Sequence, residues 1–186
     1  MDLRPLRQLL ERYAAAWPRE AAACSRFLGF VDSHDDCLLR SCAPGHVTAS
    51  AWILSPDRGA ALLTHHKKLG KWLQLGGHVD GEVEVERACL REAQEESGMA
   101  RFEFVAWSGD GLTPIDLDVH TIPARPGEPQ HLHWDVRFLL VAGADQQLSM
   151  SDESNRLEWA PVRELRIFTT EESVLRLQRK AAQVMT

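Results

Sequence analysis

Three glutamates stand close together near the middle of the chain, in a run that ends at Gly98. On a helical wheel, Glu95 and Glu96 both fall within about 60° of Glu92. The same stripe carries three apolar residues, Val85, Ala88 and Cys89. Carboxylates at positions i, i+3 and i+4 repel one another, and burying them unpaired is costly. A hard divalent cation, which takes oxygen ligands, would supply the missing positive charge.

A glycine pair, Gly76–Gly77, follows a short apolar run and precedes this helix by a short loop. Glycines there let the backbone approach a ligand closely, and a carbonyl oxygen from the turn could be another metal ligand. A solvated surface helix, with Arg91 and Glu95 as an i, i+4 ion pair, is the alternative explanation of the acids. The glycine pair favours the metal site.

The run from Gly77 to Met99, GHVDGEVEVERACLREAQEESGM, resembles the signature of the Nudix hydrolases. That signature is a glycine, a spacer, a glutamate, a second spacer and then Arg-Glu-aliphatic-x-Glu-Glu-x-Gly-aliphatic. Gly77 and Arg91 stand at the required separation, and the segment after Arg91 matches throughout. One departure is plain, because Val83 occupies the position of the first glutamate, with a glutamate on either side.

The resemblance implies a metal-dependent hydrolase that cuts the diphosphate linkage of a nucleoside diphosphate derivative, such as a nucleotide sugar, ADP-ribose or a related nucleotide. It implies that Gly76 offers its carbonyl oxygen and that Glu92, Glu95 and Glu96 offer carboxylates to Mg²⁺ or Mn²⁺. Arg91 would orient a glutamate through a charge-assisted hydrogen bond. The metal ions would neutralise the diphosphate and lower the pKa of a water molecule.

The general base is expected to be a glutamate that is not fully engaged in metal ligation. Glu153, in the run SDESNRLEW, resembles a late-loop acid of the family members that cleave oxidised nucleotides. The alternative is that Glu153 is an exposed loop residue. The base is therefore Glu92 or Glu153.

The segment 131–142 alternates polar and apolar side chains in the manner of a strand. Its polar face carries His131, His133, Asp135 and Arg137. This face could line a substrate cleft or could be a solvated sheet face. His78, directly after the glycine pair, is near enough in sequence to reach phosphates. We therefore predict four substrate contacts: His78, His131, His133 and Arg137.

The elements that position these residues follow from hydrophobic periodicity and from turn residues. We predict strands at about 46–53, 60–66, 72–75, 102–108, 116–123, 131–142 and 157–160, and helices at about 3–17, 21–30, 84–97 and 171–184. Strands and helices mix without a regular βαβ alternation. The fold class is therefore α+β: a Nudix-type α/β/α sandwich with a mixed sheet, preceded by an N-terminal helical segment.

The chain divides into a helical extension, residues 1–40, and a Nudix hydrolase domain, residues 41–186. The first helix carries an apolar stripe of Leu3, Leu6, Leu10, Tyr13 and Trp17. Exposed on a monomer, this stripe would be an unusually large patch. It either caps its own domain or builds a homodimer, and we favour the dimer because helical additions often make two-fold contacts.

The resemblance implies a small nucleotide-type molecule as the partner, and the composition argues against two other classes. The chain has 186 residues and a net charge of −6, which argues against nucleic acid and anionic membranes, because both need a basic surface. A zinc site from His34, Cys37, Cys42 and His46 fits no common ligand spacing, so reduced thiols are expected. Without a recognisable signal segment, the protein is expected to be cytoplasmic.

A function of another class remains open, which is a catalytically silent Nudix-fold module that binds nucleotides or regulates. The intact cluster of Glu92, Glu95 and Glu96 favours the enzyme, because a silent module does not need three clustered acids. The substrate itself is not determined by the sequence.

Overall fold

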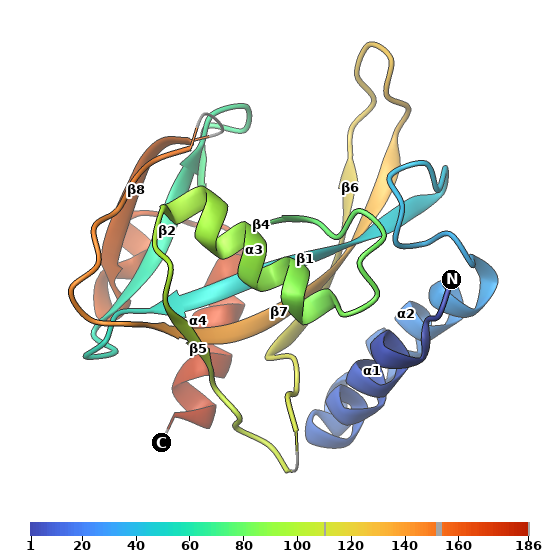
Figure 1. The fold of residues 1–186 in the computed structure, drawn as a ribbon, viewed down its shortest axis with the longest axis horizontal. Helices are drawn as coiled ribbons and strands as arrows, with labels where there is room; N and C mark the ends of the chain where they lie inside the picture. Colours follow the sequence, from blue (N-terminus) through green and yellow to red (C-terminus); the bar gives the residue numbers. More distant parts are fainter. Residues whose placement is uncertain (110, 152–153, 186) are drawn as a thin grey trace.

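The computed structural model describes residues 1–109, 111–151 and 154–185, and its centre is a mixed β-sheet (Figure 1). The eight strands of the sheet are β1 (Gly45–Leu54), β2 (Ala60–His66), β3 (Lys71–Leu73), β4 (Leu75–His78), β5 (Phe102–Phe104), β6 (Asp116–Ile122), β7 (His131–Ala142) and β8 (Ser154–Pro161). The longest path through the described sheet runs β3-β2-β1-β7-β5, with β4 paired to β1, β6 to β7 and β8 to β2. β1 and β7 are parallel, whereas the other pairs are antiparallel.

Helices cover both faces of this sheet. They are α1 (Arg4–Ala16), α2 (Ala21–Ser33), α3 (Val85–Ser97) and α4 (Glu172–Val184), with short 3₁₀ turns η1 (Pro18–Glu20) and η2 (Val162–Ile167). Neighbouring residues of β1 point to opposite faces: Ile53 joins the hydrophobic cluster under α1, α2 and α3, whereas Trp52 joins the cluster under α4. The predicted α+β sandwich with a mixed sheet is confirmed.

The helix α3 forms where the sequence predicts it. Its apolar residues Val85, Ala88 and Cys89 are buried against the sheet. The helix ends at Gly98, whose φ of 71° is left-handed and whose N–H donates to the carbonyl of Gln94 at 2.8 Å. Glycine is favoured here because a side chain would be strained in this conformation. This cap fixes the end of the helix that carries the glutamates.

The apolar stripe of α1 is covered by the chain itself. Leu6, Leu10 and Tyr13 are fully buried and belong to the same hydrophobic cluster as α3. On α2, Phe30 stacks on Trp134 of β7 with ring centroids 4.4 Å apart. The exposed patch that favoured a homodimer is therefore absent from a single chain, and the intramolecular cap accounts for the stripe. Among the described residues, no helix is both long and apolar enough to cross a membrane.

Candidate functional site

The glycine pair of β4 lies against two carboxylates of α3. The Gly76 N–H donates to Glu96 Oε2 at 2.9 Å. A Cβ atom on Gly77 would lie 2.6 Å from Glu92 Cδ, so a side chain there would force the Glu92 carboxylate to move. Gly76 has a φ of 150°, and a side chain there would collide with Ser50 of β1. The two glycines thus allow the helix and strand to approach closely enough to hold both acids.

Arg91 connects these acids to the strand. Its Nη1 atom donates to Glu92 Oε1 at 2.6 Å and lies 3.4 Å from Glu95 Oε2. Its Nη2 atom donates to the backbone carbonyl of His78 at 2.8 Å. A guanidinium held at both ends fixes the orientation of the Glu92 carboxylate. We call Arg91, Glu92, Glu95 and Glu96 the acidic site.

The donor set of the acidic site fits a hard divalent cation. Glu96 is buried, with 7% of its surface exposed, whereas the Glu95 side chain is 62% exposed. Arg91 pairs with Glu92 and Glu95, whereas Glu96 accepts from the Gly76 N–H. Carboxylate oxygens and a backbone carbonyl at Gly76 are the ligand types that Mg²⁺ and Mn²⁺ prefer. These residues fit the ion that the sequence implied.

Val83, which replaces the first glutamate of the signature, and the neighbouring Glu84 both have partners outside the acidic site. Val83 packs on the hydrophobic core, and the neighbouring Glu84 pairs with Arg87 at 2.8 Å. Glu153, the alternative general base, lies outside the described residues, so its role stays a prediction.

Three of the histidines predicted as substrate contacts come together. The ring centroid of His133 lies 5.2 Å from that of His131 and 5.2 Å from that of His78. His46, which was not among the predicted contacts, adds a fourth ring, 4.8 Å from His133 and 5.0 Å from His78. The register of the strands explains why these rings are close together. His46 of β1 lies opposite His133 of β7, and Thr48 of β1 lies opposite His78 of β4.

Burial keeps most of these imidazoles neutral. It lowers the pKa of His46 and of His78 to about 4, assisted at His46 by the neighbouring His131 and at His78 by Arg40. It lowers the pKa of His133 to about 2, with His46 as the next cause. These three rings therefore carry no charge at pH 7, and their nitrogens act as hydrogen-bond donors or as lone-pair ligands.

Arg137, the remaining predicted substrate contact, is buried in a network of charged side chains. Only 1% of its surface is exposed. Its Nε donates to Asp135 at 2.7 Å, its Nη2 to Asp118 at 3.0 Å and its Nη1 to Asp116 at 3.3 Å. The Ser173 carbonyl of α4 also accepts from Nη1. Arg137 is the centre of this buried network, and its role as a substrate contact stays a prediction.

In this buried network, cationic side chains pair with the aspartates. It consists of Asp116, Asp118, Asp135, Arg137, Arg176 and Lys180. Lys180 of α4 also donates to the Tyr13 hydroxyl at 2.6 Å and pairs with Glu20 at 2.8 Å. The network therefore links α1 and η1 to α4 and to the sheet, which gives it a structural role.

The sequence gives part of the evidence that places His46 with the other histidines. His46 is the first residue of the first predicted strand, and the alternation of side chains along that strand puts it on the polar face. Its proximity to His133 depends on the parallel pairing of β1 with β7, which lies outside any local pattern. The considered zinc ligands Cys37 and Cys42 are buried free thiols.

Comparison with known proteins decides the family. A family model described as the NUDIX domain matches residues 44–180. The chain belongs to this family. It is accordingly a Nudix hydrolase, an enzyme that acts on a phosphoric anhydride. Residues 1–43, which include α1 and α2, lie outside the match.

Solved structures agree with this fold. A hydrolase of the NUDIX family from Clostridium perfringens is 25% identical, with a TM-score of 0.60, over 76% of this chain and 98% of that chain. An Ap4A hydrolase from C. elegans is 15% identical, with a TM-score of 0.59, over 75% and 96% of the two chains. The dihydroneopterin triphosphate pyrophosphohydrolase of E. coli is 15% identical, with a TM-score of 0.54, over 72% and 92%. No curated protein matches the sequence.

Proposed function

We propose that this Nudix hydrolase cuts the diphosphate linkage of a nucleoside diphosphate derivative with the help of Mg²⁺ or Mn²⁺. The observation that carries the proposal is the acidic site, where three carboxylates lie beside Arg91 and a glycine turn. Two of the similar structures are named for Ap4A and for dihydroneopterin triphosphate, and both names agree with a phosphoric anhydride as the bond that is cut.

The residues divide the work as follows. Glu92, Glu95, Glu96 and the Gly76 carbonyl would hold the ions. When bound, these ions neutralise the diphosphate and lower the pKa of a water molecule. Arg91 orients the Glu92 carboxylate, and the Gly76 N–H orients that of Glu96. The proton of the attacking water passes to a carboxylate, either Glu92 or Glu153.

His78 is our proposed contact to the substrate phosphates. Its backbone carbonyl accepts from Arg91, so it adjoins the acidic site, and its ring is neutral at pH 7. A neutral imidazole N–H can donate to a phosphate oxygen without adding charge. His131 and His133 lie farther along the same group of rings.

The test is a panel of nucleoside diphosphate sugars, ADP-ribose, dinucleoside polyphosphates and modified nucleotides, assayed with Mg²⁺, with Mn²⁺ and with chelator. We expect turnover only with the metal ion. Glu96→Gln should lower kcat by about 10³-fold, because it removes the charge of a proposed metal ligand. The matched control is Glu103→Gln, an exposed glutamate of β5, which should leave turnover unchanged.

Circular dichroism and thermal melting would show that both variants fold. Near-full turnover by Glu96→Gln would contradict the acidic site. A wild-type chain that binds nucleotides but hydrolyses none of them would instead support the silent binding module.

A further inference from the structure

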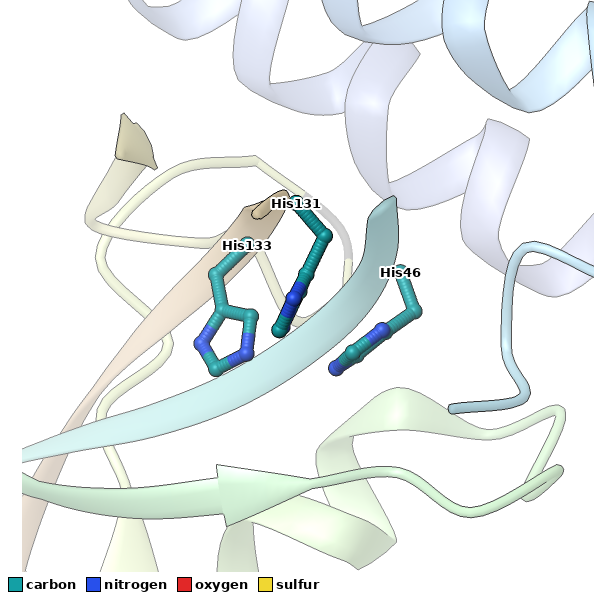
Figure 2. A group of neighbouring side chains, drawn as sticks. All are labelled: His46, His131 and His133. Carbon is teal, nitrogen blue, oxygen red and sulfur yellow. The ribbon is translucent and has the colours of Figure 1, made fainter. Parts of the chain in front are cut away.

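Three imidazoles converge at one end of the central strand pair (Figure 2). β1 and β7 run parallel and begin together, with Gly45 opposite Leu132 and His46 opposite His133. His131 lies two residues earlier on β7 and points to the same side. One ring nitrogen from each of the three histidines lies within 4.8 Å of the other two.

Several of these ring nitrogens have no hydrogen-bond partner although they are buried. Both nitrogens of His46 are in this state, and so is Nε2 of His131. A buried polar atom without a partner costs on the order of 1–3 kcal/mol. Such atoms are rare in folded proteins, and here they share one place. The arrangement therefore indicates a ligand that accepts lone pairs from several imidazoles.

The hydrogen bond of His131 shows which of its nitrogens is available. Its Nδ1 lies 2.9 Å from the carbonyl oxygen of Pro129. A carbonyl can only accept, so Nδ1 carries a hydrogen, and in the neutral form of the ring Nε2 presents a lone pair. That Nε2 is the buried atom without a partner. A histidine that binds a metal ion through one nitrogen typically donates its other N–H to a backbone carbonyl in this way.

The chemistry of the ligands favours a transition metal over the ion of the acidic site. All three groups are imidazoles, and each offers one ring nitrogen to the same place. Neutral imidazole suits Zn²⁺, Cu²⁺ or Ni²⁺, whereas Mg²⁺ and Ca²⁺ prefer oxygen ligands. The acidic site offers oxygens and this group offers nitrogens, so the two would select different ions.

To bind one metal ion, the three ring nitrogens would have to move slightly closer together. With Zn–N bonds of about 2.0–2.1 Å, two nitrogens of a tetrahedral site are about 3.3 Å apart. Rotation of the rings would bring the nitrogens from within 4.8 Å to this spacing. Glu128 Oε1 lies 3.7 Å from His131 Nε2, and the Glu128 side chain is about half exposed. A carboxylate, a water molecule or a substrate oxygen can thus reach the fourth position.

We propose that His46, His131 and His133 bind a second kind of metal ion, of the Zn²⁺ class, at a site distinct from the acidic site. The ion would join the first residues of β1 and β7. His78 lies between the two sites: its ring is 5.0 Å from that of His46, and its carbonyl accepts from Arg91. The ion would therefore place positive charge close to the proposed phosphate contact.

The test uses the full chain, stripped with chelator and titrated with Co²⁺ in a large excess of Mg²⁺, which occupies oxygen sites. Co²⁺ bound by imidazoles in a four-coordinate site has a strong visible absorption. We expect this absorption to saturate at one equivalent and to disappear on addition of one equivalent of Zn²⁺. Elemental analysis after gel filtration should find one Zn²⁺ per chain. A wild-type chain without stoichiometric binding would overturn the proposal.

Variants locate the ion. His46→Gln should weaken Co²⁺ binding by at least about 100-fold, since it removes a ligand. If that variant does not fold, His133→Ala, at a partly exposed position, gives the same test. His65→Ala of β2 is the matched control and should bind as the wild type does. Glu96→Gln should also retain Co²⁺ binding. Binding that survives in His46→Gln or His133→Ala but is lost in Glu96→Gln would assign the ion to the acidic site and overturn the proposal.

Discussion

Two regions of this molecule gather three carboxylates beside an arginine, and they differ in burial. In the acidic site, Arg91 pairs with Glu92 and Glu95, and its side chain is 36% exposed. In the buried network, Arg137 is joined by Arg176 and Lys180, so three cations pair with three aspartates. Buried charges are tolerated when they are paired in this way.

The comparison separates a structural cluster from a candidate site. From sequence alone, the helix that carries the glutamates and the polar face of β7 both resembled a binding surface. The aspartates of the buried network pair with cations from other elements, whereas the Glu95 side chain of the acidic site is 62% exposed and within reach of a divalent cation. The histidine group differs from both, because buried nitrogens of His46 and His131 have no hydrogen-bond partner among the described residues.

The largest expected contrast in stability comes from removing each arginine. Arg137→Met should lower the free energy of unfolding by about 3–5 kcal/mol, because it leaves buried aspartates without their cation. Arg91→Met should lower it by less than about 1 kcal/mol, because its ion pairs are partly exposed, while turnover falls. Urea denaturation measures both. Arg156→Met, an exposed arginine of β8, is the control.

Equal stability losses in Arg137→Met and Arg91→Met would contradict this difference, since the buried network would then contribute no more to the stability of the fold than the acidic site does.

Neutralising one carboxylate in each region should also change the free energy of unfolding by different amounts. Asp116 is fully buried and accepts from Arg137, Arg176 and Lys180. Asp116→Asn should therefore lower the free energy of unfolding by about 2–3 kcal/mol. In metal-free protein, Glu95→Gln should change it by less than about 0.5 kcal/mol or increase it slightly, because repulsion between glutamates is relieved.

Thermal melts of the metal-free variants, followed by urea titrations, give both values. A destabilisation by Glu95→Gln as large as that by Asp116→Asn would mean that the glutamates hold the fold together without an ion.

Local signals in the sequence predicted much of the fold. The bounds of β2 and β7 match the prediction, because alternation and turn residues are local features. The same holds for α3 and for its end at Gly98, where a left-handed residue is required. The predicted strand 72–75 is instead two short strands, because the chain leaves β2 after Leu73 and joins β1 from Leu75.

Features that depend on contacts between distant parts of the chain could not be predicted from the sequence. The polar face of β7 is continuous in sequence, but α4 covers Arg137 and leaves His133 partly exposed. The apolar stripe of α1 was correctly expected to be buried, yet its partner inside the same chain was not readable from the stripe itself. The acidic site was predictable because its residues lie within one helix and the adjacent turn, whereas the histidine group depends on strand pairing.

The smallest expected effect is a change in the free energy of unfolding at low pH, and it depends on Asp118 in the buried network. Burial opposes its ionisation, but the hydrogen bond from His120 and the charges of Arg137 and Arg176 outweigh this, so its pKa lies well below the usual 3.8. A carboxyl whose pKa is lower in the folded state contributes stability that is fully present above its unfolded pKa. That contribution is lost as the pH falls through the folded value.

Asp118→Asn should therefore cost about 1 kcal/mol at pH 7, because charge-assisted hydrogen bonds are lost while the side chain keeps an oxygen acceptor. The difference from wild type should persist down to about pH 4 and shrink below it, as Asp118 becomes protonated in the unfolded wild type. Urea midpoints at pH 7, 5 and 3 would show this. Asp32→Asn, at an exposed ion pair on α2, is the control. A difference between Asp118→Asn and wild type that stayed constant to pH 3 would mean that the charge of Asp118 contributes nothing to stability, and that the network is held together by shape and neutral hydrogen bonds.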